Sequence, residues 1–124
     1  MAGMLYLVPT PIGNLGDISK RAQETLESAD FIAAEDTRVT LKLLNHLELK
    51  KPLVSYYEHN KSFKGEKSLD RILGGETCAL VSDAGSPAIS DPGEDLVKQC
   101  AAAGIPVCAI PGPCAAITAL SISG

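Results

Sequence analysis

The sequence predicts an α/β fold: a mostly parallel sheet of five strands with helices on both faces. Short apolar runs of strand length alternate with helical segments along all 124 residues. This alternation of strand and helix is typical of parallel sheets, and the apolar character of the runs suits strands buried between two helix layers. Glycine and proline clusters separate the segments, as expected for the turns of such a fold.

Five apolar runs are the predicted strands. The run at 52–56 is the least apolar of them, so we place it nearer an edge of the sheet. The run at 77–81 is followed by a polar loop that contains Gly85 and Pro87, so it is the clearest strand end. The five predicted strands are Met4–Val8, Phe31–Ala34, Pro52–Tyr56, Thr77–Val81 and Ile105–Ile110.

A helix is predicted after each strand. In the first, Ile18, Ala22, Leu26 and Ala29 form an apolar stripe at helical spacing. In the fourth, Asp91 is the expected N-cap, because proline and glutamate follow it in the first turn. The predicted helices run from Asp17 or Ser19 to about Ala29, from Val39 to Leu47, from about Ser62 to Leu73, from Pro92 to Ala103, and from Cys114 to about Ser123.

Composition indicates one globular domain with a real core, since 45% of the residues are hydrophobic. The four cysteines include no C-x-x-C pair and no histidine at metal-ligand spacing, so we expect reduced thiols, no metal and a cytosolic setting. No basic region precedes the first apolar residues, which argues against a signal peptide. Residues 101–124 carry no charge, but glycines and prolines interrupt them, so a strand, turn and helix are expected instead of a membrane span.

Charge is unevenly distributed. The chain has a net charge of −4, yet residues 38–71 contain eight Lys/Arg and four acids. One interpretation of this segment is a solvated helical face. The other is a basic edge that faces an anionic partner such as nucleic acid, with Tyr56, Tyr57 and Phe63 available for stacking on bases. Composition alone leaves both open.

The carboxyl ends of parallel strands share one edge of a sheet, where open α/β folds bind ligands. The loops expected there are 9–16, 35–38, 57–60, 83–91 and 111–114. The sequence lacks the G-x-G-x-x-G, Walker and G-x-S-x-G patterns, which removes most support for dehydrogenase, kinase and hydrolase functions.

Four segments, in order and at suitable spacing, carry a family resemblance: VPTPIGNLGDIS (8–19), AEDTR (34–38), VSDAGSPAISDPG (81–93) and IPGPCAAITALS (110–121). Together they resemble the tetrapyrrole-methylase-like, class III S-adenosylmethionine-dependent methyltransferases. The match is closest to members that methylate a cytidine ribose 2′-hydroxyl of 16S ribosomal RNA in the small subunit. The resemblance implies a homodimer whose subunits have two domains, with residues 1–124 as the N-terminal one and the cofactor held between the two.

The resemblance also implies site residues. The first loop lies beside the substrate, the 83–89 loop holds the methionine and ribose parts of S-adenosylmethionine, and the 113–116 turn holds the adenine. Ser86 stands where other members carry aspartate, and Asp83 is expected to take over part of that role. The implied cofactor residues are Pro11, Gly13, Asp83, Ala84, Gly85, Ser86, Pro87, Ile89, Pro113, Cys114, Ala115 and Ala116.

Four polar residues are candidates for catalysis. Arg38 is a candidate for binding RNA phosphate, and Glu35 or Asp36 for orienting the ribose hydroxyl. Each has a structural alternative, because Asp36 can cap the following helix and Arg38 can pair with an acid. His59 is a candidate general base, since histidine titrates near neutrality; a surface histidine is more often without such a role.

Three other interpretations compete with this resemblance. A tetrapyrrole methylase of the same family fits less well, because AEDTR and the basic segment favour an RNA substrate. A receiver-like signalling domain shares the length and the acidic residues, but here the acidic pair follows the second strand and no lysine follows the fifth. A non-catalytic dimerisation module is the third.

Overall fold

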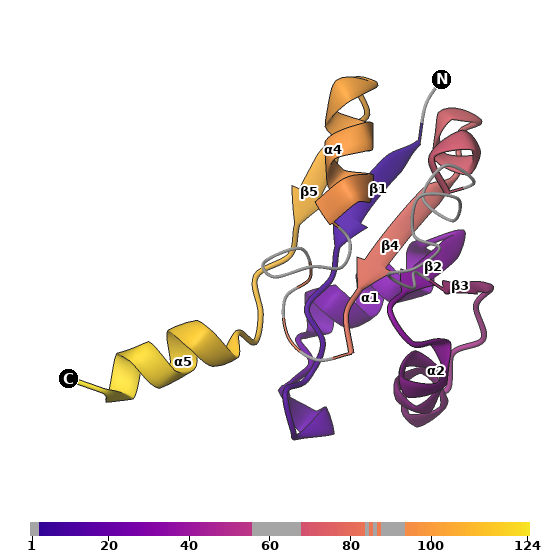
Figure 1. Ribbon diagram of the computed structural model, residues 1–124. Helices are drawn as coiled ribbons and strands as arrows, with labels where there is room; N and C mark the ends of the chain where they lie inside the picture. Colours follow the sequence, from indigo (N-terminus) through magenta and orange to yellow (C-terminus); the bar gives the residue numbers. More distant parts are fainter. Residues whose placement is uncertain (1–2, 56–67, 84, 86, 88–93) are drawn as a thin grey trace.

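Figure 1 shows a computed structural model, which describes residues 3–55, 68–83, 85, 87 and 94–124. Its five strands form one sheet in the order β3-β2-β4-β1-β5, and every pair of neighbours is parallel. The predicted sheet is therefore confirmed, including the edge position of the third strand. The strands are β1 (Met4–Leu7), β2 (Phe31–Ala34), β3 (Leu53–Ser55), β4 (Thr77–Val81) and β5 (Val107–Ala109).

The helices follow the predicted order with small shifts at their ends. They are η1 (Leu15–Asp17), α1 (Lys20–Ser28), α2 (Thr37–His46), α4 (Glu94–Ala102) and α5 (Ala115–Ile122), and residues 68–73 are also helical. Of the predicted helix at 62–73, residues 62–67 lie outside the described residues, as do Asp91 and Pro92 at the predicted start of α4.

The start of the first helix decides between two predicted caps. Asp17 belongs to the 3-10 turn η1, whose own N-cap is Asn14. The Ser19 hydroxyl accepts a hydrogen bond from Ala22 N (3.0 Å), so Ser19 is the cap of α1. The prediction that Asp17 caps this helix is thus wrong. Asp17 ends the 3-10 turn, and the extended backbone of Ile18 and Ser19 separates that turn from α1.

Two apolar layers cover the sheet. Ala22 and Leu26 of α1 and Leu43 and Leu44 of α2 pack on one face. The other face is covered by α4, through Leu96 and Cys100, and by the helical residues 68–73, through Ile72. Helices thus lie on both faces, as the apolar character of the strands predicted.

The central strand β4 contributes to both layers. Ala79 and Val81 face α1 and α2, whereas Cys78 and Leu80 face α4, and all four are buried. Burial raises the pKa of the Cys78 thiol to about 12, so this thiol stays protonated and packs as a small apolar side chain. All four cysteines are free, and Cys108 in β5 is only half-buried.

The strand order contradicts the receiver-like alternative. Receiver domains of the flavodoxin type have the order 2-1-3-4-5. Here β4 lies between β2 and β1 and takes the centre of the sheet. The acidic residues that follow β2 and β4 therefore lie at the ends of adjacent strands. In the receiver order, strands 2 and 4 are not adjacent.

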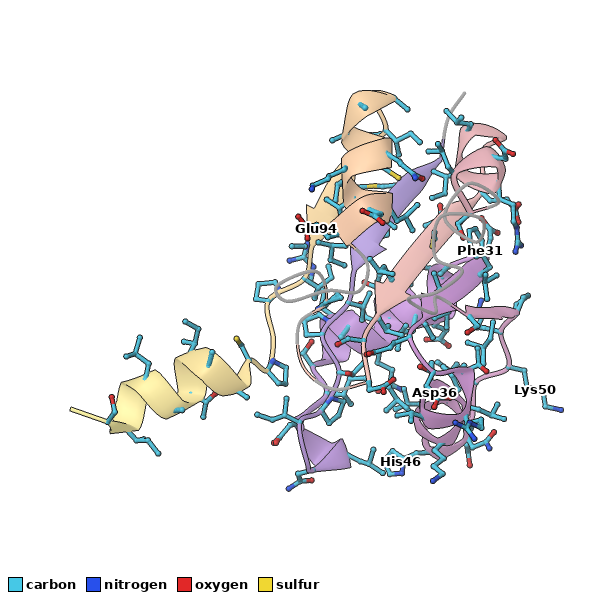
Figure 2. The ribbon with its side chains drawn as sticks, in the orientation of Figure 1. Phe31, Asp36, His46, Lys50 and Glu94 are labelled. Carbon is cyan, nitrogen blue, oxygen red and sulfur yellow. The ribbon has the colours of Figure 1, made fainter. Side chains whose placement is uncertain are left out.

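The uncharged stretch at 101–124 contains β5, a turn and α5, as predicted. Figures 1 and 2 show α5 extending away from the sheet. None of its residues is buried, and Ile117, Leu120 and Ile122 are 63%, 68% and 84% exposed. Within the described part of the chain, no helix is long and apolar enough to cross a bilayer.

The core arrangement predicts different effects for two leucines of α2. Leu44 is fully buried, whereas Leu41 is 48% exposed. We expect Leu44→Ala to lower the free energy of unfolding by about 2–5 kcal/mol, because it leaves a cavity in the core. The control Leu41→Ala should change it by less than about 0.5 kcal/mol. Urea unfolding followed by circular dichroism measures both, and equal losses would contradict this assignment of the core face.

Candidate active site at the carboxyl edge of the sheet

The sheet has a topological switch point between β1 and β4. The chain leaving β1 crosses to β2 on the far side of β4, and the chain leaving β4 crosses to β5 on the far side of β1. The loops that follow β1 and β4 therefore lead to helices on opposite faces of the sheet, α1 on one and α4 on the other. In open α/β sheets, ligands bind in the crevice at such a switch point.

A main-chain pair ties these two loops together. Thr10 N donates to Gly85 O (3.0 Å) and Gly85 N donates to Thr10 O (2.9 Å), which makes an isolated antiparallel bridge. Two hydroxyls support it: Thr10 Oγ1 donates to Ser82 O (3.3 Å) and Ser82 Oγ donates to Gly85 O (3.4 Å). Thr10 is buried, so the pair is a fixed part of the site.

A third loop, residues 111–113, meets the other two at their glycines. Gly85 has φ +82°, and a Cβ there would lie 3.2 Å from Ile12 Cγ2 and 3.4 Å from Pro113 O. A Cβ at Gly112 would lie 2.5 Å from Pro9 Cβ. The three loops can approach this closely only because glycine stands at both positions.

Acidic side chains from two strands meet beside the bridge. Glu35 follows β2, and its Oε2 accepts a hydrogen bond from Asp83 N (3.3 Å) after β4. The neighbouring Asp36 is the N-cap of α2, since its Oδ1 accepts from Arg38 N (2.9 Å). The Arg38 guanidinium also binds both carboxylate oxygens of Asp36, from Nε at 3.2 Å and from Nη2 at 3.0 Å.

These contacts move two carboxyl pKa values in opposite directions. The hydrogen bonds from Arg38 lower the pKa of Asp36, which keeps Asp36 ionised as a cap. Partial burial raises the pKa of Asp83, and the nearby negative charge of Asp36 adds to this effect. A main-chain hydrogen bond from Asp36 offsets part of the increase.

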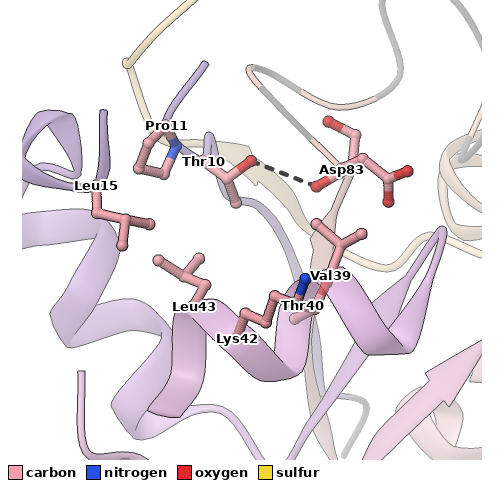
Figure 3. Close-up of a pocket in the computed structure, with 9 residues that line it drawn as sticks. Thr10, Pro11, Leu15, Val39, Thr40, Lys42, Leu43 and Asp83 are labelled. Atoms are coloured by element: carbon pink, nitrogen blue, oxygen red, sulfur yellow. Dashed lines mark hydrogen bonds between the residues drawn. The ribbon is translucent and has the colours of Figure 1, made fainter. Parts of the chain in front are cut away.

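A pocket of about 240 Å³ opens between these loops and α2 (Figure 3). Leu15 of η1 and Leu43 of α2 point toward one another across it. Lys42 and Asp83 are the charged side chains among the described lining residues. The described lining residues are Thr10, Pro11, Leu15, Val39, Thr40, Lys42, Leu43, Ser82 and Asp83.

The structure brings together many of the sequence-predicted residues. Pro11 and Asp83 line the pocket, Gly85 pairs with Thr10, Pro113 lies beside Gly85, and Glu35 contacts Asp83. Gly13 is exposed in the first loop, Pro87 is buried, and Cys114 is the N-cap residue of α5. Ala115 and Ala116 are exposed on α5. His59, Ala84, Ser86 and Ile89 lie outside the described residues.

Several residues of the site were missed by the sequence analysis. Thr10 and Ser82 hold the bridge, and Gly112 permits contact with Pro9. The position of Thr10 between two prolines was an available signal. The pocket wall formed by Val39 and Leu43 gave no signal, because apolar side chains on a helix are equally typical of packing in the core.

Comparison with known proteins identifies the family. The family model for Tetrapyrrole (Corrin/Porphyrin) Methylases matches residues 4–124. The chain belongs to the tetrapyrrole methylase family. Its sheet, with loops converging at the switch point, is thus the fold expected from the four motifs.

Two relatives of this tetrapyrrole methylase domain have the same name. The Ribosomal RNA small subunit methyltransferase I of Halalkalibacterium halodurans is 59% identical, over 98% of this chain and 42% of its own length. The protein of that name from Vibrio cholerae is 55% identical, over 99% of this chain and 43% of its own. The chain thus spans less than half the length of these curated relatives.

A solved structure supports the fold at lower identity. The uroporphyrin-III C-methyl transferase of Thermus thermophilus, complexed with S-adenyl homocysteine, superposes with a TM-score of 0.71. It is 19% identical, and the match covers 94% of this chain and 51% of that one. At this identity the match shows a shared fold and leaves the substrate open.

The raised pKa of Asp83 predicts a pH-dependent effect of Asp83→Asn. Well below the usual aspartate pKa of about 3.9, the carboxyl is protonated in both folded and unfolded states, so the aspartate carries no penalty. As pH rises through that value, the unfolded state loses its proton first, which destabilises the fold. We expect Asp83→Asn to unfold at higher urea concentration than wild type at pH 7, and this gain to shrink toward pH 4. A pH-independent difference would contradict the prediction.

Proposed function

We propose that this chain forms part of a methyltransferase that transfers a methyl group from S-adenosylmethionine to a cytidine ribose 2′-hydroxyl of 16S ribosomal RNA. The observation that carries the proposal is the convergence at the switch point of three family loops, through residues 9–13, Ser82, Asp83 and Gly85, and residues 111–113. The names of the relatives at 52–59% identity support an rRNA substrate over a tetrapyrrole.

The residues present fit a small polar cofactor at these loops. Because Gly85 and Gly112 lack side chains, the three loops pack against one another there and bring their main-chain groups together at one edge of the sheet. We assign the methionine and ribose parts to the loop that includes Asp83 and Gly85, and the adenine to the turn that includes Pro113 and Cys114. Bound S-adenosylmethionine would supply an electrophilic methyl group.

The chain's own residues would position the acceptor and shield it from water, which is the main requirement of an in-line methyl transfer. Glu35 is our candidate for orienting the ribose hydroxyl, since Asp36 already caps α2 and binds Arg38. Arg38 is 83% exposed and remains the candidate for an RNA phosphate. His59 stays a candidate for the proton acceptor.

Residues 1–124 would be the N-terminal domain of a two-domain subunit, with a second domain closing the cofactor site. The greater length of the relatives supports this, and so does the exposed apolar surface of α5. As in the resemblance, we propose a homodimer that acts on the small ribosomal subunit in the cytoplasm.

A chimera tests the activity. Residues 1–124 are joined to the remaining part of the Vibrio cholerae relative, and the purified protein is incubated with small ribosomal subunits and radiolabelled S-adenosylmethionine. We expect label in 16S rRNA, at a nucleotide that resists alkaline cleavage because its 2′-oxygen is methylated. The control is the same chimera with Glu35→Gln, expected to be at least tenfold slower. Label on a base, or on a tetrapyrrole only, would refute the proposed reaction.

Cofactor placement is tested on the chain itself. Gly112→Ala puts a Cβ against Pro9, so the 111–113 loop must shift. We expect this variant to bind S-adenosylhomocysteine at least tenfold more weakly than wild type in isothermal titration calorimetry. The control Gly74→Ala, whose Cβ would meet only ordinary contacts at 3.4 Å or more, should bind normally. Equal affinities for both variants would place the cofactor elsewhere.

A further inference from the structure

We propose that the pocket and the adjoining exposed face of α2 form the docking surface for single-stranded RNA, with one unstacked nucleotide inserted in the pocket. We call this the α2 surface and define it by Leu15, Arg38, Val39, Lys42 and His46. The inference rests on the proposed function, because it names where the substrate of that same site would bind.

The pocket has the walls that a flat, partly apolar ring requires. Its surface is mainly aliphatic: Leu43 is buried beneath it, while Leu15 and Val39 are 44% and 38% exposed at its rim. Ile12 of the first loop adds a further exposed apolar side chain, at 38%. Large apolar groups exposed together around a pocket commonly mark a binding site, and apolar side chains hold nucleobases that leave their stack.

The charge beside the pocket suits a phosphate backbone. α2 contains no acidic residue, and Arg38, Lys42 and His46 follow one another at i, i+4 and i+8, on one stripe of the helix. Figure 2 marks Asp36 and His46 near the two ends of α2. Since Asp36 neutralises Arg38, the uncompensated charge is that of Lys42, which has no hydrogen-bond or ion-pair partner within the described residues and lines the pocket.

The two charged lining groups also give the nucleotide a direction. Lys42 belongs to α2, whereas Asp83 belongs to the loop that pairs with Thr10 through Gly85. A nucleotide with its phosphate at Lys42 would turn its ribose toward Asp83 and the neighbouring Glu35, whose carboxylate accepts from Asp83 N and can also accept a hydrogen bond from the 2′-hydroxyl. That hydroxyl would then lie next to the loops assigned to the cofactor.

RNA is favoured over an acidic protein partner by the combination of features. A solvated acidic peptide needs only the charges, whereas an unpaired nucleotide needs a charge next to an apolar pocket of limited size. A duplex keeps its bases stacked, so the partner we infer is single-stranded. The net charge of −4 disfavours general attraction of polyanions, so binding must depend on this local surface.

The charge is tested with the 124-residue chain and a fluorescein-labelled single-stranded RNA of about ten nucleotides, a length within the range that other single-strand-binding domains cover. Fluorescence anisotropy is measured over a series of salt concentrations. We expect Lys42→Ala to bind roughly three- to tenfold more weakly and to reduce the slope of log K against log salt by about 0.7, the loss of one phosphate contact. The control Lys98→Ala, which removes the same charge from α4 on the opposite face, should keep the wild-type slope.

The pocket is tested by filling it without changing charge. Val39→Phe puts a ring into the pocket, and we expect roughly tenfold weaker RNA binding with an unchanged salt slope, because the loss is of base insertion. The control Leu41→Phe lies on the same helix, and Leu41 is exposed and not among the lining residues. It should bind like wild type, and circular dichroism checks that both variants fold.

Each contrary outcome has a defined meaning. No RNA binding by the chain, or equal effects of Lys42→Ala and Lys98→Ala, would overturn the inference. Binding of poly-glutamate with the same variant pattern as RNA, and no effect of Val39→Phe, would overturn it in favour of an acidic protein partner. If the chain binds S-adenosylhomocysteine but fails these tests, only the RNA surface is wrong. If the chimera methylates no RNA, the proposed function fails independently.

Discussion

Two main-chain hydrogen bonds between Thr10 and Gly85 join the loops after β1 and β4, and the geometry of the site depends on them. The bridge is antiparallel although the two strands are parallel, so the chain must reverse direction just beyond the strand ends. A positive φ at Gly85 is part of that reversal. The reversal also brings Gly85 beside Pro113, which sets the place of the third loop. A single backbone pair thus couples three segments far apart in sequence.

Charge in the site is divided between two roles. Asp36 and Arg38 neutralise one another and fix the start of α2, and the lowered pKa of Asp36 reflects this structural use. Asp83 sits where burial and a like charge raise its pKa, so it is held at a cost to the fold. Groups whose environment opposes their charge are frequent at functional sites. The structure therefore separates the acid that stabilises α2 from the acid that lines the pocket.

The sequence was sufficient for the strands, the two helix layers and the edge where the loops meet, because apolar runs and turn residues are local signals. It correctly placed Asp83, Gly85 and Glu35 at the same edge of the sheet. It could not give the order β3-β2-β4-β1-β5, since strand order depends on which crossovers the helices make. The 3-10 turn before Ser19 was missed, and with it the pocket, because Leu15 and Val39 acquire their facing positions only through the packing of η1 near α2.

The pocket explains how an acidic chain could bind an anionic polymer. With a net charge of −4, long-range attraction cannot supply the affinity. The charge on α2 itself differs from that of the whole chain, since its charged side chains are basic and the carboxylate of its N-cap Asp36 is paired with Arg38. Affinity would then come from short-range contacts at Lys42 and from apolar contact in the pocket, both effective within the screening length of physiological salt. Such a surface would favour an RNA segment with an unpaired nucleotide over a regular duplex. The shape of the pocket would then contribute to substrate choice independently of the identity of the base.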